Sequence, residues 1–259
     1  PGSPSRKYLR PGKIELAHCR APQFHYATIP GGVKCSDSAL LPFRRTPARA
    51  HPGHPAIRKM IKPSEMRDKA DIRREARAFW QELTTAKKTG DYVRLERSFE
   101  GFLRSMESPK KASVCLAFYP LASEFNVLKA LRQQRWSVAL PLVGSGYSLS
   151  FHLFLEEGRE VQTLTTGAYG IQEPRADSPV VRPSSGDVLI VPSMAANSKG
   201  FRLGKGGGFY DRLMEKSEFA ALEKWAVLPE KLLDAPFEAE AHDLRLDRII
   251  TEERIVTYP

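Results

Sequence analysis

Apolar residues recur at helical spacing in two segments that open the body of the chain. Residues 65–84 carry one such stripe opposite a basic face, and residues 91–105 carry a second. Apolar positions three and four residues apart fall on one side of a helix, so both segments are predicted to be amphipathic helices. The stripes consist of Ile72, Ala76, Phe79, Trp80 and Leu83, and of Tyr92, Leu95, Phe99, Phe102, Leu103 and Met106.

Short, nearly continuous apolar runs follow, and further helical segments separate them. Runs of this kind are typical of strands covered on both faces, as in parallel sheets. Residues 155–186 are polar and rich in turns, and no internal repeat is visible. The pattern predicts a single three-layer α/β/α domain with a mostly parallel sheet. The predicted strands are 113–119, 136–140, 149–154, 187–191, 225–228 and 248–251, and the predicted helices begin at Ser123-Glu124 and run from Tyr210 to about Lys224.

Four glycines occupy five consecutive positions between a predicted strand and a predicted helix, within Phe201–Arg212. Glycine buries no side chain and loses much backbone entropy on folding, so packing does not explain the run. It suits a main chain that turns tightly and presents N–H groups to an anion at the start of a helix. Arg202 and Lys205 add positive charge. The segment predicts a phosphate site, with an ordinary glycine-rich surface loop as the alternative.

Two common nucleotide motifs do not fit this segment. The P-loop needs Gly-x4-Gly-Lys-Ser/Thr, but Gly200 and Gly204 are one residue too close, and Gly206 follows Lys205 where a hydroxyl is required. The dinucleotide fingerprint Gly-x-Gly-x-x-Gly would place Phe209 at its third glycine. The segment therefore predicts an anion site of another kind.

The net charge of +10 is concentrated near the N-terminus. Residues 1–59 hold 11 of the 40 Lys and Arg but 2 of the 30 Asp and Glu, and they also hold 9 of the 20 prolines. This composition predicts a disordered basic extension over residues 1–60, ahead of a nearly neutral folded domain at 61–259. Pro1-Gly2-Ser3 is typical of a cloning remnant. Solvated disorder is favoured over nucleic-acid binding by the extension.

The cysteines and the hydrophobic runs bear on the compartment. Cys115 falls inside a predicted strand, which argues against a disulfide framework, and no apolar run approaches the ~18 residues of a membrane span. Cys19, Cys35 and the nearby histidines match no usual paired spacing of zinc ligands. We therefore expect a cytoplasmic protein with no membrane attachment.

The glycine segment, preceded by a strand that ends at Val191-Pro192, closely resembles the signature of the 5-formyltetrahydrofolate cyclo-ligase family, also called methenyltetrahydrofolate synthetases. Three other segments agree in order and spacing, as does the closing His242-Asp243 followed by Asp247. The three segments are Lys69-x-x-Ile72-Arg73, Tyr119-Pro120-x-x-Ser123-Glu124 and Tyr169-Gly170-Ile171-x-Glu173-Pro174. The resemblance covers about Lys69 to Thr251.

The resemblance implies an enzyme that uses ATP and magnesium to convert 5-formyltetrahydrofolate into 5,10-methenyltetrahydrofolate. The formyl oxygen would attack the γ-phosphate of ATP, and N10 of the folate would then attack the imidate phosphate and expel phosphate. Such a protein has to align the reactants, neutralise the phosphates and exclude water. Its partners would be folate and ATP, and we expect a monomer.

The resemblance also assigns roles through the matched motifs. Lys205 and Arg202 would act in catalysis, Lys205 by stabilising charge on the transferred phosphoryl group. Asp211 and Asp243 would hold Mg²⁺, which prefers carboxylate oxygens. The residues implied to bind ATP are Lys69, Arg73, Arg202, Leu203, Gly204, Lys205, Gly206, Gly207, Gly208, Phe209 and Tyr210. Those implied to bind folate are Tyr119, Glu124, Tyr169, Lys205, Gly206, Gly207, Gly208 and Phe209.

Structural alternatives stay open for several of these residues. On the helix, Lys69 and Arg73 could belong to a solvated basic face. Glu124 could stabilise a helix N-terminus through the helix dipole. Asp211 could be a helix N-cap and Asp243 a turn residue.

One segment departs from the family pattern. Met194-Ala195-Ala196-Asn197 stands where the family usually has an aliphatic-Ala-Phe-Asp run. If the absent phenylalanine packs on folate, substrate affinity would fall; if the absent acid helps to hold magnesium, the metal site would weaken. This departure leaves open a folate- or nucleotide-binding protein of the same fold with impaired catalysis.

Overall fold

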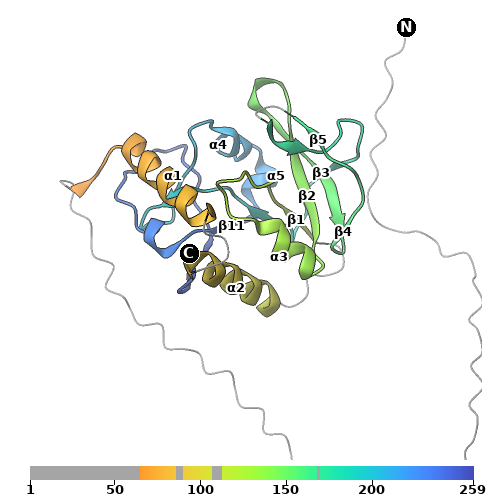
Figure 1. The fold of residues 1–259 in the computed structure, drawn as a ribbon. Coiled ribbons are helices and arrows are strands. Elements are labelled where there is room, and N and C mark those ends of the chain that lie inside the picture. Colours follow the sequence, from red (N-terminus) through yellow and green to blue (C-terminus); the bar gives the residue numbers. More distant parts are fainter. Residues whose placement is uncertain (1–64, 86–89, 107–112, 168–169) are drawn as a thin grey trace, which may run out of the picture. The chain divides into compact units, whose positions relative to one another are not determined.

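A mixed sheet forms the centre of the computed structural model, which describes residues 65–85, 90–106, 113–167 and 170–259. Its strands are β1 (Val114–Leu116), β2 (Ser137–Val143), β3 (Leu149–Glu156), β4 (Arg159–Glu160), β7 (Val180–Val181), β8 (Val188–Ile190), β11 (Glu223–Val227), β12 (Arg248–Ile250) and β13 (Ile255–Thr257). They lie in the order β13-β12-β11-β8-β1-β2-β3-β4, and β7 also pairs with β3. Figure 1 shows β1, β2, β3 and β4 together at one end of this sheet. The run from β12 to β2 is parallel throughout, whereas β13, β3, β4 and β7 are antiparallel.

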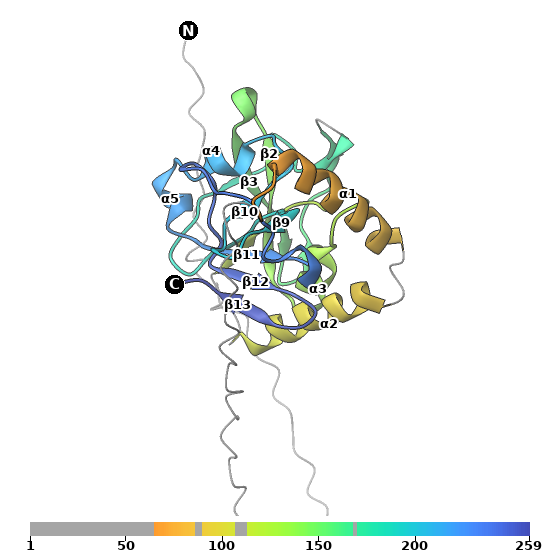
Figure 2. The ribbon, with the colours of Figure 1, turned by 90° about the vertical axis from the view of Figure 1, so that its left-hand side faces the viewer.

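Helices cover both faces of this sheet. They are α1 (Lys69–Thr85), α2 (Gly90–Ser105), α3 (Val127–Gln133), α4 (Phe209–Leu213) and α5 (Ser217–Ala220). Figure 2 shows α2 and α3 on one side of the central strands and α4 and α5 on the other. Phe102 of α2 meets Trp225 of β11 edge-on at 4.9 Å between ring centroids, and Phe219 of α5 lies 5.7 Å from Phe151 of β3. The predicted three-layer α/β/α architecture is confirmed.

Small elements join these layers near the carboxyl ends of the parallel strands. Two short hairpins pair β5 (Thr165–Thr166) with β6 (Gln172–Glu173) and β9 (Ala195–Ala196) with β10 (Arg202–Leu203). Single 3-10 turns are η2 (Ser145–Tyr147) and η4 (Glu230–Leu232). Among the described residues, none of the helices has both the length and the apolar character needed to cross a membrane.

The helix predicted to begin at Ser123-Glu124 begins instead at Val127. Asn126 is its N-cap, because the side-chain oxygen of Asn126 accepts a hydrogen bond from the Lys129 amide at 3.2 Å. The Glu124 carboxylate accepts instead from the Leu121 amide in the preceding turn. The expectation that Glu124 lies in the first turn of a helix is therefore wrong.

The helix predicted from Tyr210 to Lys224 is two short helices, α4 and α5. Lys216 between them has an extended backbone, with φ −89° and ψ 119°, which interrupts the i to i−4 hydrogen bonds. The chain is already in β11 at Glu223. Apolar residues at helical spacing fit two separate turns as well as one continuous helix, so the pattern could not distinguish them.

Strand β2 is longer than predicted and continues through Pro141 to Val143. Its pairing with β1 ends at Ala139, and beyond that point it pairs only with β3. Proline lacks a backbone N–H and is tolerated where one edge of a strand has no partner. The sheet therefore projects past β1 and forms part of a wall beside the glycine segment.

Some predictions fall on residues outside the described ranges. They are the basic extension at 1–60 with its boundary, the cysteine and histidine residues within it, and Tyr169.

Candidate active site

Two cavities adjoin the glycine segment and share part of its wall. We call the first the polar cleft; it has a volume of about 1230 Å³ and is lined by Lys69, Arg73, Glu240 and Asp243 among other residues. The second, the apolar cavity, has a volume of about 570 Å³ and is lined by aromatic residues that include Trp80, Phe118, Tyr119 and Phe209. Residues common to both walls are Arg202, Gly204, Gly206, Gly208 and Asp211.

The glycines are required by backbone conformation and by close approach. Gly206 and Gly208 have φ of +99° and +68°, a region that side-chain-bearing residues rarely adopt. At Gly204, a Cβ would lie 2.3 Å from Nη1 of Arg202. Helix α4 after the loop has only five residues, so positive charge at this site comes from the arginine and lysine side chains rather than from a long helix.

Arg202 is the buried centre of the shared wall. Its guanidinium donates to Oδ1 of Asp211 at 2.9 Å, and its side chain is 5% exposed. Burial lowers the pKa of Arg202, and the Asp211 carboxylate opposes that shift. The Nε atom of Arg202 and the hydroxyl of Tyr210 are buried without hydrogen-bond partners among the described residues. Arg202 thus fixes the position of Asp211 and keeps one donor unused.

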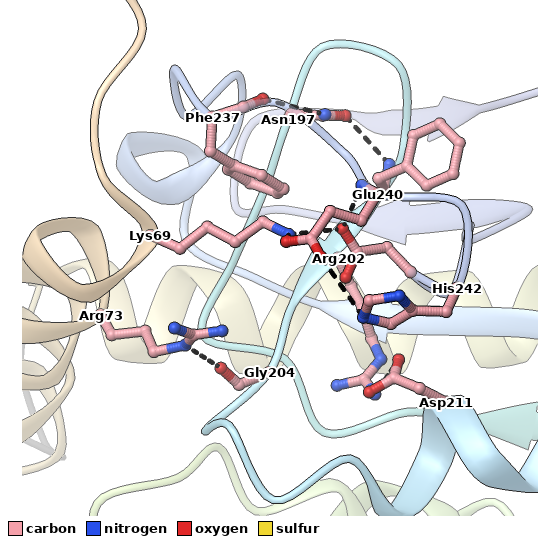
Figure 3. A network of polar contacts seen from close by, with 11 residues as sticks. Lys69, Arg73, Asn197, Arg202, Gly204, Asp211, Phe237, Glu240 and His242 are labelled. Atoms are coloured by element: carbon pink, nitrogen blue, oxygen red, sulfur yellow. Dashed lines mark hydrogen bonds and ion pairs between the residues drawn. The ribbon is translucent and has the colours of Figure 1, made fainter.

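Helix α1 brings Lys69 and Arg73 to the polar cleft (Figure 3). Lys69 Nζ lies 2.8 Å from Oδ2 of Asp243 and 2.6 Å from Oε1 of Glu240. Arg73 Nε donates to the Gly204 carbonyl at 3.0 Å. The solvated-face alternative therefore does not describe these two residues, because both are tied to the walls of the cleft.

The two aspartates proposed as metal ligands both line the polar cleft. Burial opposes ionisation of Asp243, but hydrogen bonds from Lys69 and from the Glu240 amide hold its pKa below the ordinary value. Within the described part of the chain, the side-chain hydrogen bonds of each aspartate involve a single carboxylate oxygen, Oδ1 of Asp211 and Oδ2 of Asp243. Among these residues the other oxygen of each has no hydrogen bond, which fits Mg²⁺ bound through one or two carboxylates together with phosphates. No cluster of three or more His, Cys, Asp or Glu residues able to hold a metal occurs within the described ranges.

Lys205 belongs to the apolar cavity rather than to the polar cleft. Its Nζ lies 2.6 Å from Oε1 of Glu124, and Oε2 of Glu124 accepts from the Leu121 amide at 2.8 Å. Tyr119 and Phe209 line the same cavity. The structure thus brings together the residues matched to folate on one side of the glycine segment, apart from Tyr169, which lies outside the described residues.

Ala196 and Asn197, the departure from the family pattern, line neither the polar cleft nor the apolar cavity. Asn197 Oδ1 accepts from the amides of Lys199 and Phe201 at 3.0 Å, and its Nδ2 donates to the Phe237 carbonyl at 3.3 Å. Asn197 therefore organises the turn between β9 and β10. The hypothesis of impaired catalysis gains no support from these positions.

The sequence left several residues of the two walls without a role. Trp80 was assigned only to a packing stripe, yet it lines the apolar cavity and donates its indole N–H to the Met194 carbonyl at 3.2 Å. Glu240 pairs with Lys69 from a segment that carries no motif. Glu173 also lines the apolar cavity, and in the sequence only its position in the Tyr169–Pro174 motif indicated that it could lie near the site.

Comparisons with known proteins show the family of the chain. The model of the 5-formyltetrahydrofolate cyclo-ligase family matches residues 65–252. The chain is 32% identical over 147 residues to a 5-formyltetrahydrofolate cyclo-ligase of Mycolicibacterium smegmatis. This alignment covers 55% of the chain and 74% of the relative. It is also 29% identical over 109 residues to a probable 5-formyltetrahydrofolate cyclo-ligase of Schizosaccharomyces pombe. That alignment covers 38% of this chain and 53% of the relative.

A solved structure shares the fold. The structure of Aquifex aeolicus 5,10-methenyltetrahydrofolate synthetase matches with a TM-score of 0.59 and 25% sequence identity. The match covers 73% of this chain and 92% of the other.

Proposed function

The chain belongs to the 5-formyltetrahydrofolate cyclo-ligase family, and we propose that it converts 5-formyltetrahydrofolate and ATP into 5,10-methenyltetrahydrofolate, ADP and phosphate. One observation carries the proposal: a polar cleft and an apolar cavity share the wall formed by Arg202, the glycines and Asp211. A reaction that joins a phosphate donor to an apolar heterocycle needs two such compartments with a common boundary.

The apolar cavity suits the folate. Its aromatic walls match a flat ring system, and with the substrate bound they would exclude water from an imidate phosphate that is prone to hydrolysis. In the proposed reaction the formyl oxygen bonds to the γ-phosphorus while the bond to the bridging oxygen of ADP breaks. N10 then bonds to the formyl carbon and releases its proton, and the bond between that carbon and the former formyl oxygen breaks as phosphate leaves with the oxygen.

The cations on either side of the shared wall suit the phosphoryl transfer. Lys69 and Arg73 would bind the nucleotide phosphates in the polar cleft. Lys205, on the folate side and 2.6 Å from Glu124, would stabilise charge that develops on the transferred group. Glu124 would hold the ammonium in place until the reactants meet.

Asp211 and Asp243 would hold the magnesium ion, each through its available carboxylate oxygen. When bound, the ion would neutralise phosphate oxygens of the nucleotide. Arg202 keeps Asp211 oriented, and Lys69 does the same for Asp243, so the protein supplies the positions of both ligands.

A spectrophotometric cyclisation assay tests the proposal. The full chain is mixed with 5-formyltetrahydrofolate, ATP and magnesium, and absorbance of the methenyl product is followed. We expect product in the complete mixture and none when ATP or magnesium is omitted. Absence of product, with an active cyclo-ligase working alongside, would contradict the proposal.

A further inference from the structure

Glu173 is a buried carboxylate on the wall of the apolar cavity for which the proposed reaction has no use so far. It ends β6, is 4% exposed and lines the cavity, and its Oε1 has no hydrogen-bond partner among the described residues. Burial raises the pKa of Glu173, and a backbone hydrogen bond at Val143 counteracts that effect.

The structure makes room for this carboxylate. A Cβ at Gly167 would lie 2.1 Å from Oε2 and 2.2 Å from Cδ of Glu173, so a side chain at position 167 would expel the carboxylate from its place. Strand β5, which pairs with the β6 strand of Glu173, ends at Thr166, next to Gly167. The carboxylate is therefore packed in a buried position against Gly167 and is not an exposed surface group.

An unpartnered buried oxygen costs folding free energy, and the great majority of buried polar atoms are hydrogen-bonded. The other glutamate of the cavity shows the usual situation, because Oε1 of Glu124 meets Lys205 and Oε2 meets the Leu121 amide. Of these two glutamates, Glu173 is the one with an acceptor left for a ligand.

The chemistry of the cavity narrows what that ligand group is. Trp80, Phe118 and Phe209 line the cavity with aromatic rings, which suits a flat ring, and a carboxylate oxygen among them calls for a hydrogen-bond donor on that ring. The aminopyrimidine edge of a reduced pterin carries such donors. We propose that Glu173 determines specificity by accepting a hydrogen bond from this edge of the substrate, an inference that rests on the proposed function.

Two variants of the full chain test this role. Glu173→Met removes the acceptor at similar volume, and Glu173→Gln keeps an acceptor oxygen but removes the charge. Calorimetry measures the Kd for 5-formyltetrahydrofolate without ATP, and the cyclisation assay measures KM and kcat. The matched control is Glu157→Gln, an exposed glutamate 3.3 Å from Arg135 and remote from the cavity lining.

We expect Glu173→Met to raise the Kd for folate by about tenfold to a hundredfold, the range for a hydrogen bond to a charged group. Glu173→Gln should have a smaller effect, and the KM for ATP should stay unchanged in both. Glu173→Met removes the unpartnered oxygen but also the backbone hydrogen bond at Val143, so thermal unfolding of both variants is measured beside the Kd. A residue that merely supported the fold would lower the unfolding temperature without changing the preference between folate and an analogue that lacks the contacted group.

An analogue with hydrogen in place of the 2-amino group identifies the contacted edge. Wild-type protein should bind it more weakly than the parent folate, and Glu173→Met should discriminate less between the two. The inference is overturned if Glu173→Met keeps its Kd within twofold of wild type, or if it weakens both ligands equally.

The outcomes separate this inference from the proposed function. If wild-type protein binds folate without forming product, the proposed function fails and calorimetry still decides the role of Glu173. If wild-type protein turns over and Glu173→Met binds normally, only the inference fails. Absence of folate binding by the wild type overturns both.

Discussion

The polar cleft and the apolar cavity share one wall, but the polar groups that line only one of them differ in how many of their atoms have a partner. In the cleft, Lys69 is paired with Asp243 and Glu240, and Arg73 is bonded to the Gly204 carbonyl. In the cavity, Glu173 and Tyr210 each keep a buried polar atom without a hydrogen-bond partner among the described residues.

This difference suggests two modes of recognition. A phosphate that binds in the cleft has to compete with the carboxylates paired with Lys69 or with the Gly204 carbonyl bonded to Arg73, so binding there is an exchange of interactions. A ring that enters the cavity can make hydrogen bonds to atoms that have no partner among the described residues, so these bonds displace none inside that part of the protein. Substitutions in the two cavities should therefore change ligand affinity in different directions and by different amounts.

Lys205, which lines the apolar cavity next to the shared wall, should give the largest effect. Lys205→Ala should lower kcat by about 10²–10³, the range for a group that stabilises transition-state charge, while the Kd for folate changes only a few-fold. Single-turnover assays and calorimetry measure the two quantities. Lys129→Ala, which breaks an exposed pair with Glu96, is the control and should behave like wild type. Unchanged kcat in Lys205→Ala would remove this residue from the mechanism.

Asp211 tests whether the shared wall depends on its buried ion pair. Asp211→Asn leaves the Arg202 charge, 5% exposed, without its counterion and should lower the free energy of unfolding by about 2 kcal/mol. Urea denaturation measures the loss. Asp177→Asn breaks an exposed pair with Arg175 and should leave the urea midpoint unchanged. Equal urea midpoints for Asp211→Asn and Asp177→Asn would show that the ion pair between Arg202 and Asp211 does not stabilise the shared wall.

Glu240 tests the idea of exchange in the polar cleft and should give the smallest effect. Its carboxylate competes with phosphates for Lys69, and its side chain is 60% exposed. Glu240→Gln should therefore tighten ATP binding by a factor of about two to five, in line with an exposed ion pair. Equilibrium binding of ATP, with Glu96→Gln as control, measures this change. Weaker binding in Glu240→Gln would mean that Glu240 supports the nucleotide site instead of competing for it.

Much of the fold could be predicted from the sequence because it depends on local patterns. Continuous apolar runs at 113–119 and 187–191 predicted strands β1 and β8, which lie side by side in the parallel centre. Helical spacing predicted α1 and α2. The same reasoning was wrong at Glu124 and at Lys216, where a cap and a backbone turn interrupt the helical pattern.

The site was predictable only in its composition. The motifs named the residues of the shared wall. The glycine segment was recognisable because the left-handed backbone at Gly206 and Gly208 favours glycine at those positions. Their division between two cavities was not predictable. Lys205 was grouped with both the ATP and the folate residues, and in the structure its side chain lines only the apolar cavity, beside Glu124.

The sequence by itself determined the order of strands and helices along the chain, the glycine loop and the charged residue types near it. Only the tertiary structure decided which of those charges are already paired and which polar atoms are left open. The reason is distance along the chain: Lys69 and Asp243 are 174 residues apart, and Arg73 and Gly204 are 131 apart. Periodicity and motifs describe neighbours in sequence, whereas the partner of a buried or half-buried polar group is set by how distant segments pack.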